Sequence, residues 1–246
     1  MPNIQITLEY EGTNYDGWQR QKNTHRTIQE IIESVLFKIL REKVKLIAAG
    51  RTDAGVHARA QTANFSAKNK IPLSKLQYSL NSLLPEDIKV TVIRQVPPDF
   101  HSRFSAVSKT YRYTILNRDY PSVFLRKYVY LCSYMLNIKL MQEAAGYLIG
   151  EHDFTSFKNG NDAQEKSCVR KMESIKINKE NDYIYMDFAA NGFLRNMVRN
   201  IAGTLIEAGR GKLKPNKIKE ILLSKNRKSA GPTAPACGLC LIKVKY

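Results

Sequence analysis

The first hundred residues alternate between strand-like and helix-like periodicity, and this order limits the fold to a few classes. Residues 3–10 carry apolar side chains at every second position, which indicates a strand with one buried face. Residues 27–41 carry them at helical spacing, and Thr27 with Glu30 has the spacing of a capping box at the start of this helix. Further elements are expected downstream: strands at 61–66 and 88–96, and a helix at 74–84. The order strand, helix, strands, helix, strand predicts an α+β fold.

Pro97 and Pro98 open a polar stretch that we expect to be a hinge into a second α+β half. The predicted domains are therefore 1–105 and 106–246. Within the second, strands are expected at 109–117, 172–178, 183–189 and 239–246, and helices at 137–149, 193–208 and 215–223. No apolar run reaches the roughly 18–20 residues of a membrane span, and the N-terminus does not look like a signal peptide. We therefore expect a cytoplasmic protein with no membrane partner.

The chain has a formal net charge of +17, which indicates a polyanionic partner. The excess is concentrated after residue 209, where ten cations accompany one acid, Glu220. Such a run is usually a solvated face. The imbalance here predicts a phosphate-binding surface.

Residues 48–58 place one carboxylate, Asp53, on a turn between Gly50 and Gly55. Glycine adopts backbone angles that other residues avoid, so a sharp turn is expected. Arg51 lies two residues away, and a nearby opposite charge keeps a carboxylate ionised. An ionised carboxylate on a rigid turn can be a nucleophile, a general base or a metal ligand. The alternative is that Asp53 only supports the turn.

Two other side chains are candidates. Tyr111 lies between cations, which suits stacking on a base beside phosphates, but it also fits the core of a strand. Arg199 follows apolar residues on an expected helix, so it either pairs with an anion or extends to solvent.

Metal and cofactor sites are not indicated. His57 has no companions at metal-ligand spacing, and we interpret it as structural. Cys237 and Cys240 form a single C-x-x-C without the second pair of a zinc site, so the cysteines are expected to be reduced thiols. Nucleotide-binding glycine motifs are absent from the sequence.

Residues 50–58 resemble the signature of the tRNA pseudouridine synthase A family, in which this stretch carries the catalytic aspartate. Other blocks resemble the family in the same order along the whole chain: 10–12, 17–21, 27–29, 80–81, 84–85, 87–88, 100–101, 103–104, 111–113, 150–157, 192–194, 197–199, 230–231, 233–235 and 238–239.

The resemblance implies a cofactor-free isomerase that converts uridine to pseudouridine in the anticodon stem-loop of tRNA, at positions 38, 39 and 40. Asp53 would be the nucleophile, attacking either C6 of the uracil or C1′ of the ribose. Tyr111 would stack on the base and help to remove the C5 proton, while Arg199 would pair with Asp53. Arg51 would hold the base out of the helix, and Leu239 would line the pocket.

For the fold, the resemblance implies two ferredoxin-like halves joined into a central antiparallel sheet flanked by helices, with the catalytic cleft between the halves. It also implies a homodimer that binds tRNA by shape. Two other functions suit the charge and Tyr111: a non-catalytic RNA-binding protein, and a pseudouridine synthase for another RNA. Asp53 argues against the first, because a pure RNA binder gains nothing from an anion among cations.

Overall fold

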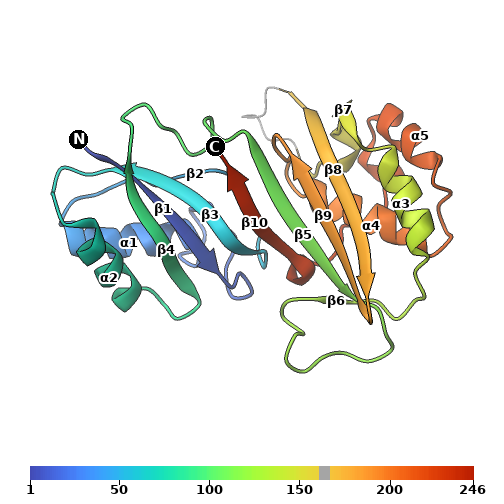
Figure 1. Cartoon of the computed structure of the whole chain (residues 1–246), viewed down its shortest axis with the longest axis horizontal. Coiled ribbons are helices and arrows are strands. Elements are labelled where there is room, and N and C mark those ends of the chain that lie inside the picture. Colours follow the sequence, from blue (N-terminus) through green and yellow to red (C-terminus); the bar gives the residue numbers. More distant parts are fainter. Residues whose placement is uncertain (161–166) are drawn as a thin grey trace. The chain divides into compact units, whose positions relative to one another are not determined.

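The computed structural model describes residues 1–160 and 167–246 and has the expected α+β architecture (Figure 1). Contacts divide the chain into two compact units. The first contains residues 1–107 and 240–246, and the second contains residues 108–239. The first unit ends close to the predicted hinge, but it also takes in the last seven residues, which the sequence had placed in the second half. None of the helices in the described residues could span a membrane.

The first unit runs strand, helix, strand pair, helix, strand, as predicted. Its elements are β1 Asn3–Tyr10, α1 Ile28–Leu40, β2 Ile47–Ala48, β3 His57–Ser66, α2 Leu73–Leu83, β4 Ile88–Val96 and most of β10 Leu239–Lys245. The sheet order is β4-β1-β3-β10, with β2 also paired to β3. These pairs are antiparallel except β3 with β10, which is parallel.

Helix α1 begins where the sequence predicted, because the Thr27 side chain caps it by accepting a hydrogen bond from the Glu30 amide. Its apolar stripe and the inward face of β1 form the core of this unit. In α2, Leu76 and Leu80 are buried, whereas Leu83 is 52% exposed.

The outer face of β1 departs from the prediction of a half-buried strand. Asn3 and Gln5 are buried as well. The polar segment that begins at Pro97 packs on Asn3, and the Arg94 side chain donates to the Gln5 side chain. The side-chain amide of Asn3 donates to the carbonyls of Pro97 and Phe100 at 3.0 and 2.9 Å. The backbone amide of Ser102 donates to the Asn64 side chain at 2.9 Å. The predicted hinge is therefore fixed to the first unit over much of its length.

The second unit is built on a sheet with the order β5-β9-β8-β7, in which all pairs are antiparallel. Its elements are β5 Ser108–Leu116, β6 Tyr130–Leu131, α3 Ile138–Gly146, β7 Gly150–Asp153, β8 Val169–Glu180, β9 Tyr183–Ala190, α4 Met197–Gly209 and α5 Lys217–Ser224. Strand β6 pairs with β5 in parallel. Large buried side chains from this sheet and from α4 form the second core.

Several boundaries in this unit differ from the prediction. Strand β8 is longer at both ends than the predicted 172–178. Helix α4 begins at Met197 rather than 193, because Asn196 adopts a left-handed conformation with φ of 58°. Helix α3 ends at Gly146 instead of continuing to 149. Residues 150–157, for which no element was predicted, contain β7 and a short 3-10 helix, Thr155–Phe157.

Candidate active site

The turn that carries Asp53 is held through its backbone on both sides. The Thr52 carbonyl accepts a hydrogen bond from the Trp18 amide at 3.0 Å. The Thr52 hydroxyl lies 2.8 Å from the hydroxyl of Tyr10. The Asp53 carbonyl accepts from the Val56 amide at 3.1 Å. The residues that make these hydrogen bonds are buried or half-buried. A change in the backbone at Asp53 would leave their polar groups unpaired, at a cost of about 1–3 kcal/mol for each group.

Two glycines bring the segment after β1 against this turn. A β-carbon on Gly12 would lie 2.0 Å from the carbonyl oxygen of Val56. On Gly17, where φ is +89°, it would lie 2.7 Å from that of Thr52. The Gly12 amide donates to Nδ1 of His57 at 3.0 Å. His57 is 5% exposed and accepts this bond, which agrees with its predicted structural role.

Neutral polar groups complete the support of the turn. Burial raises the pKa of Tyr10, so its hydroxyl stays protonated beside Thr52. The Gln61 amide donates to the Gly50 carbonyl at 2.8 Å, at the entrance to the turn. Sequence reasoning missed Tyr10 and Gln61 as supports, and only the two glycines in the segment at 12–17 hinted at a close backbone approach.

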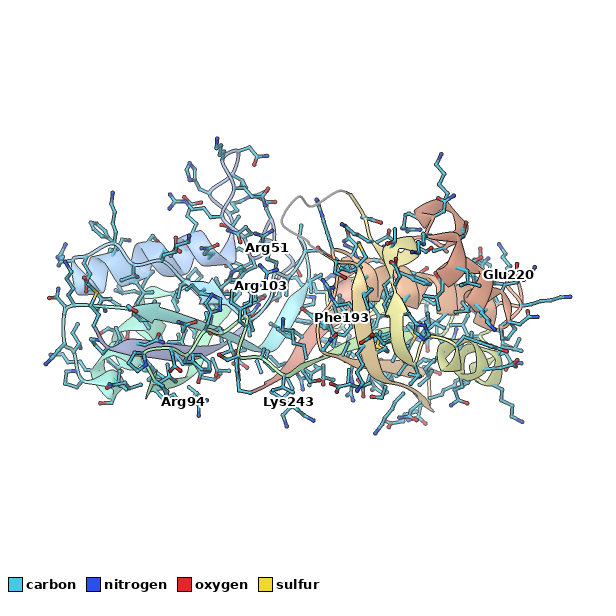
Figure 2. The ribbon with its side chains drawn as sticks, turned by 90° about the horizontal axis from the view of Figure 1, so that it is seen from above. Arg51, Arg94, Arg103, Phe193, Glu220 and Lys243 are labelled. Carbon is cyan, nitrogen blue, oxygen red and sulfur yellow. The ribbon has the colours of Figure 1, made fainter. Side chains whose placement is uncertain are left out.

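Arg51 is exposed, and its Nε donates to the Gln19 side chain at 3.0 Å (Figure 2). This bond fixes the base of the guanidinium group on the surface of the first unit. The position is compatible with contact to a nucleotide.

Tyr111 lies on β5 with its ring 6% exposed. Its ring packs edge to face with the ring of Phe193, at a centroid distance of 5.1 Å and an interplanar angle of 86°. Phe193 lies just before α4, so this contact links β5 to the approach to that helix. The burial fits the alternative in which Tyr111 packs within its unit, and the aromatic pair also fixes the ring in a defined orientation.

Arg199 lies in the first turn of α4 and is half-buried. Its Nε donates to the Ala234 carbonyl at 2.7 Å, and the Ala234 amide donates to the Arg199 carbonyl at 3.1 Å. These two hydrogen bonds set the plane of the guanidinium group.

Leu239 is 4% exposed and closes a 3-10 turn by donating its amide to the Ala236 carbonyl.

The candidates therefore lie on two units. Arg51 and Asp53 belong to the first, and Tyr111, Arg199 and Leu239 belong to the second. In the described residues, no group of three or more His, Cys, Asp or Glu side chains is arranged to hold a metal ion.

The basic tail is only partly available to a phosphate backbone. Arg210 bonds to Glu207 at 2.7 Å and stacks over the Tyr134 ring, and Arg227 is directed inward among amide and carbonyl groups. These two arginines therefore make contacts within their own unit, and the phosphate-binding surface stays a prediction. Exposed lysines such as Lys228 still fit it.

Comparison with known proteins gives a consistent result. A family model described as tRNA pseudouridine synthase matches residues 6–105 and 144–246. Proteins named tRNA pseudouridine synthase A align with all 246 residues of this chain and with their own full length. The one from Thermoanaerobacter sp. (strain X514) is 49% identical, that from Clostridium acetobutylicum 47%, and that from Acetivibrio thermocellus 44%.

Proposed function

The chain belongs to the tRNA pseudouridine synthase family, which isomerises uridine to pseudouridine in tRNA, and we propose that Asp53 is its nucleophile. We further propose that its target uridines lie in the anticodon stem-loop. The observation that supports the first proposal is the anchoring of the Asp53 turn. Hydrogen bonds to Thr52 and to the Asp53 carbonyl fix the backbone that carries the carboxylate before substrate arrives. Such preorganisation is what a nucleophile requires.

The reaction breaks the N1–C1′ bond, rotates the uracil and joins C5 to C1′. The C5 proton is released, and N1 gains a proton. The Asp53 carboxylate assists either by adding to C6 of the uracil or by displacing N1 at C1′. Both routes need an ionised, fixed carboxylate, and both end with the carboxylate restored.

Tyr111 and Arg199 serve the same reaction in this proposal. The Tyr111 ring provides a stacking surface for the uracil, and its hydroxyl takes part in removal of the C5 proton. Arg199 stabilises the ionised form of Asp53, since an opposite charge favours a carboxylate. The bond from Arg199 to the Ala234 carbonyl orients the guanidinium group for this role.

Two further contacts concern the substrate. The exposed Arg51, tethered to Gln19, holds the target nucleotide once it has left the stack, because chemistry on a base requires that it be flipped out. Leu239, buried at the start of β10, lines the pocket for the base.

The enzyme acts as a homodimer in the cytoplasm in this proposal. Phe124 and Met135 of the second unit are 90% and 91% exposed and are candidates for burial at such an interface. Sedimentation equilibrium should give about twice the chain mass of 28.1 kDa. A mass equal to that of one chain would contradict the dimer.

The target is tested with tRNA transcripts labelled with tritium at uridine C5. We expect tritium release from the complete transcript and none when the uridines of the anticodon stem-loop are replaced by cytidine. A transcript with replacements in another stem serves as the control and should release tritium normally. Release that persists without the anticodon stem-loop uridines would show that the enzyme acts elsewhere.

The role of Tyr111 is tested by removing its hydroxyl. Tyr111→Phe keeps the ring, so tRNA binding should change little, whereas single-turnover isomerisation should slow by about 100-fold or more if the hydroxyl takes part in proton transfer. Tyr147→Phe, on a partly exposed tyrosine after α3, is the matched control. An unchanged rate for Tyr111→Phe would leave the residue as a stacking or packing ring only.

A further inference from the structure

The segment 230–235 lies in direct backbone contact with α4. The Gly231 amide donates to the Thr204 hydroxyl at 2.9 Å. A β-carbon on Gly203 would lie 1.8 Å from the carbonyl oxygen of Pro232. This segment carries Ala234, whose amide and carbonyl both bond to Arg199. Movement of the segment would therefore move the partner that orients the Arg199 guanidinium group.

Arg227 holds this segment from within the unit. Its Nη1 donates to the carbonyls of Ala230 and Gly231 at 3.4 and 2.9 Å, and its Nη2 donates to the Thr233 hydroxyl at 3.0 Å. The guanidinium group thus bonds to the segment on both sides of Pro232. The planar, fork-like arrangement of its donors makes this possible, and lysine cannot reproduce it.

The same guanidinium group reaches α4 directly. Nη2 of Arg227 donates to the Asn200 side chain at 2.9 Å. Asn200 directly follows Arg199 on the helix. The Thr233 hydroxyl donates to the same Asn200 oxygen at 2.7 Å. Nε of Arg227 donates to Asn159 at 2.8 Å, and the Asn200 amide donates to that Asn159 oxygen at 3.0 Å. A closed network therefore joins Arg227, α4 and the segment.

The oxygen atoms that receive these bonds come from carbonyl, hydroxyl and amide groups. Burial lowers the pKa of Arg227, because partial removal of water destabilises the charged guanidinium group. A surface cation for RNA would need no such arrangement. At the far end of the segment, the Tyr113 hydroxyl donates to the Pro235 carbonyl at 2.9 Å, which fixes the residue after Ala234.

We propose that Arg227 is a positioning residue for Arg199, acting through the segment 230–235 and Asn200. This inference rests on the proposed role of Arg199 in the reaction. Arg227 holds the Ala234 carbonyl where it orients the Arg199 guanidinium group, and it contacts no substrate. Its effect on the reaction passes entirely through Arg199.

The test is a double-mutant cycle of Arg227→Lys and Arg199→Leu, with single-turnover rates at saturating tRNA and separately measured tRNA affinity. Arg227→Lys should slow isomerisation by about 10- to 100-fold, because small displacements of a reacting group are that costly. Its tRNA affinity should stay within about twofold of wild type. In the Arg199→Leu background, Arg227→Lys should have almost no further effect.

Arg118→Lys is the matched control, because Arg118 also bonds to a carbonyl and a side chain of its own unit, those of Tyr120 and Asp182. It should leave the rate unchanged. Two results would overturn the positioning role alone, provided that Arg199→Leu slows isomerisation. One is a wild-type rate for Arg227→Lys. The other is a double variant whose loss of rate equals the product of the two single losses. A normal rate for Arg199→Leu would overturn both the role of Arg199 and its positioning by Arg227.

Chemical rescue distinguishes the loss of positioning from a general loss of folding. Arg227→Ala should regain rate in millimolar guanidinium chloride and not in sodium chloride of equal ionic strength, because the added cation can occupy the vacated donor site. Circular dichroism at the assay temperature should show the variant folded. A folded Arg227→Ala with full activity would overturn the proposal.

Discussion

The Asp53 turn and the Arg199 segment each hold one charged group in place, but they do so with different contacts. Around Asp53, close-packed glycines and neutral donors such as Tyr10 and Gln61 support the backbone. Around Arg199, one half-buried cation, Arg227, connects several chain segments. The first arrangement distributes its support over many weak contacts, whereas the second concentrates it in one side chain. Single polar substitutions should therefore disturb the second more than the first.

The largest effects should come from the glycines at which two backbones meet. Gly12→Ala and Gly203→Ala would each place a β-carbon within 2.0 Å of a carbonyl oxygen. Each should lower the free energy of unfolding by about 3 kcal/mol or more, since overpacking against backbone has no easy relief. Gly146→Ala, at the end of α3 with no atom within 4 Å of the new β-carbon, should be neutral or stabilising. Chemical denaturation measures all three, and a stable Gly203→Ala would contradict the close contact of α4 with the segment.

A smaller effect is expected at His57. His57→Leu removes the acceptor of the buried Gly12 amide, which should cost about 1–3 kcal/mol of stability. His57→Asn places an oxygen near the position of Nδ1 and should recover part of that stability. Equal stability of the two variants would show that the bond contributes little to the Asp53 turn. Isomerisation should fall less than in Arg227→Lys, because the other contacts of the turn remain.

The smallest effect concerns tRNA binding by the exposed part of the tail. Lys225→Ala with Lys228→Ala should flatten the dependence of log K on log salt by about 0.7–0.9 for each lysine–phosphate interaction that the substitutions remove. Lys225 lies 3.0 Å from Asp153 and Lys228 is exposed. An unchanged slope would place these lysines away from the tRNA.

Local sequence signals predicted the elements well where the structure is determined locally. The capping box at Thr27 and the apolar repeat after it gave the start of α1 correctly. The start of α4 was missed, because the apolar repeat extends back through Leu194 while the left-handed Asn196 interrupts the helix. Strand β7 is four residues long and exists through its pairing with β8, which no local pattern reveals.

Sequence signals also named the candidate residues of the site, whose roles stay predictions. The glycines and arginine around Asp53 marked it as a constrained carboxylate, and the family motifs named the other candidates. Arg227 could not be distinguished from its neighbours in a basic tail, because its partners at Asn159, Asn200 and Thr233 come from three distant parts of the chain. Only the folded unit shows that this cation is directed inward.

The central claim is that the anchored Asp53 carboxylate is the nucleophile, and Asp53→Asn tests it most directly. The substitution preserves size and removes the charge, so tritium release from C5-labelled tRNA should fall by roughly 10⁴-fold or more, as for other nucleophile replacements. Affinity for tRNA should stay near wild type. Asp99→Asn, at an exposed aspartate of the same unit, should release tritium normally. Release by Asp53→Asn at close to the wild-type rate would contradict the assignment.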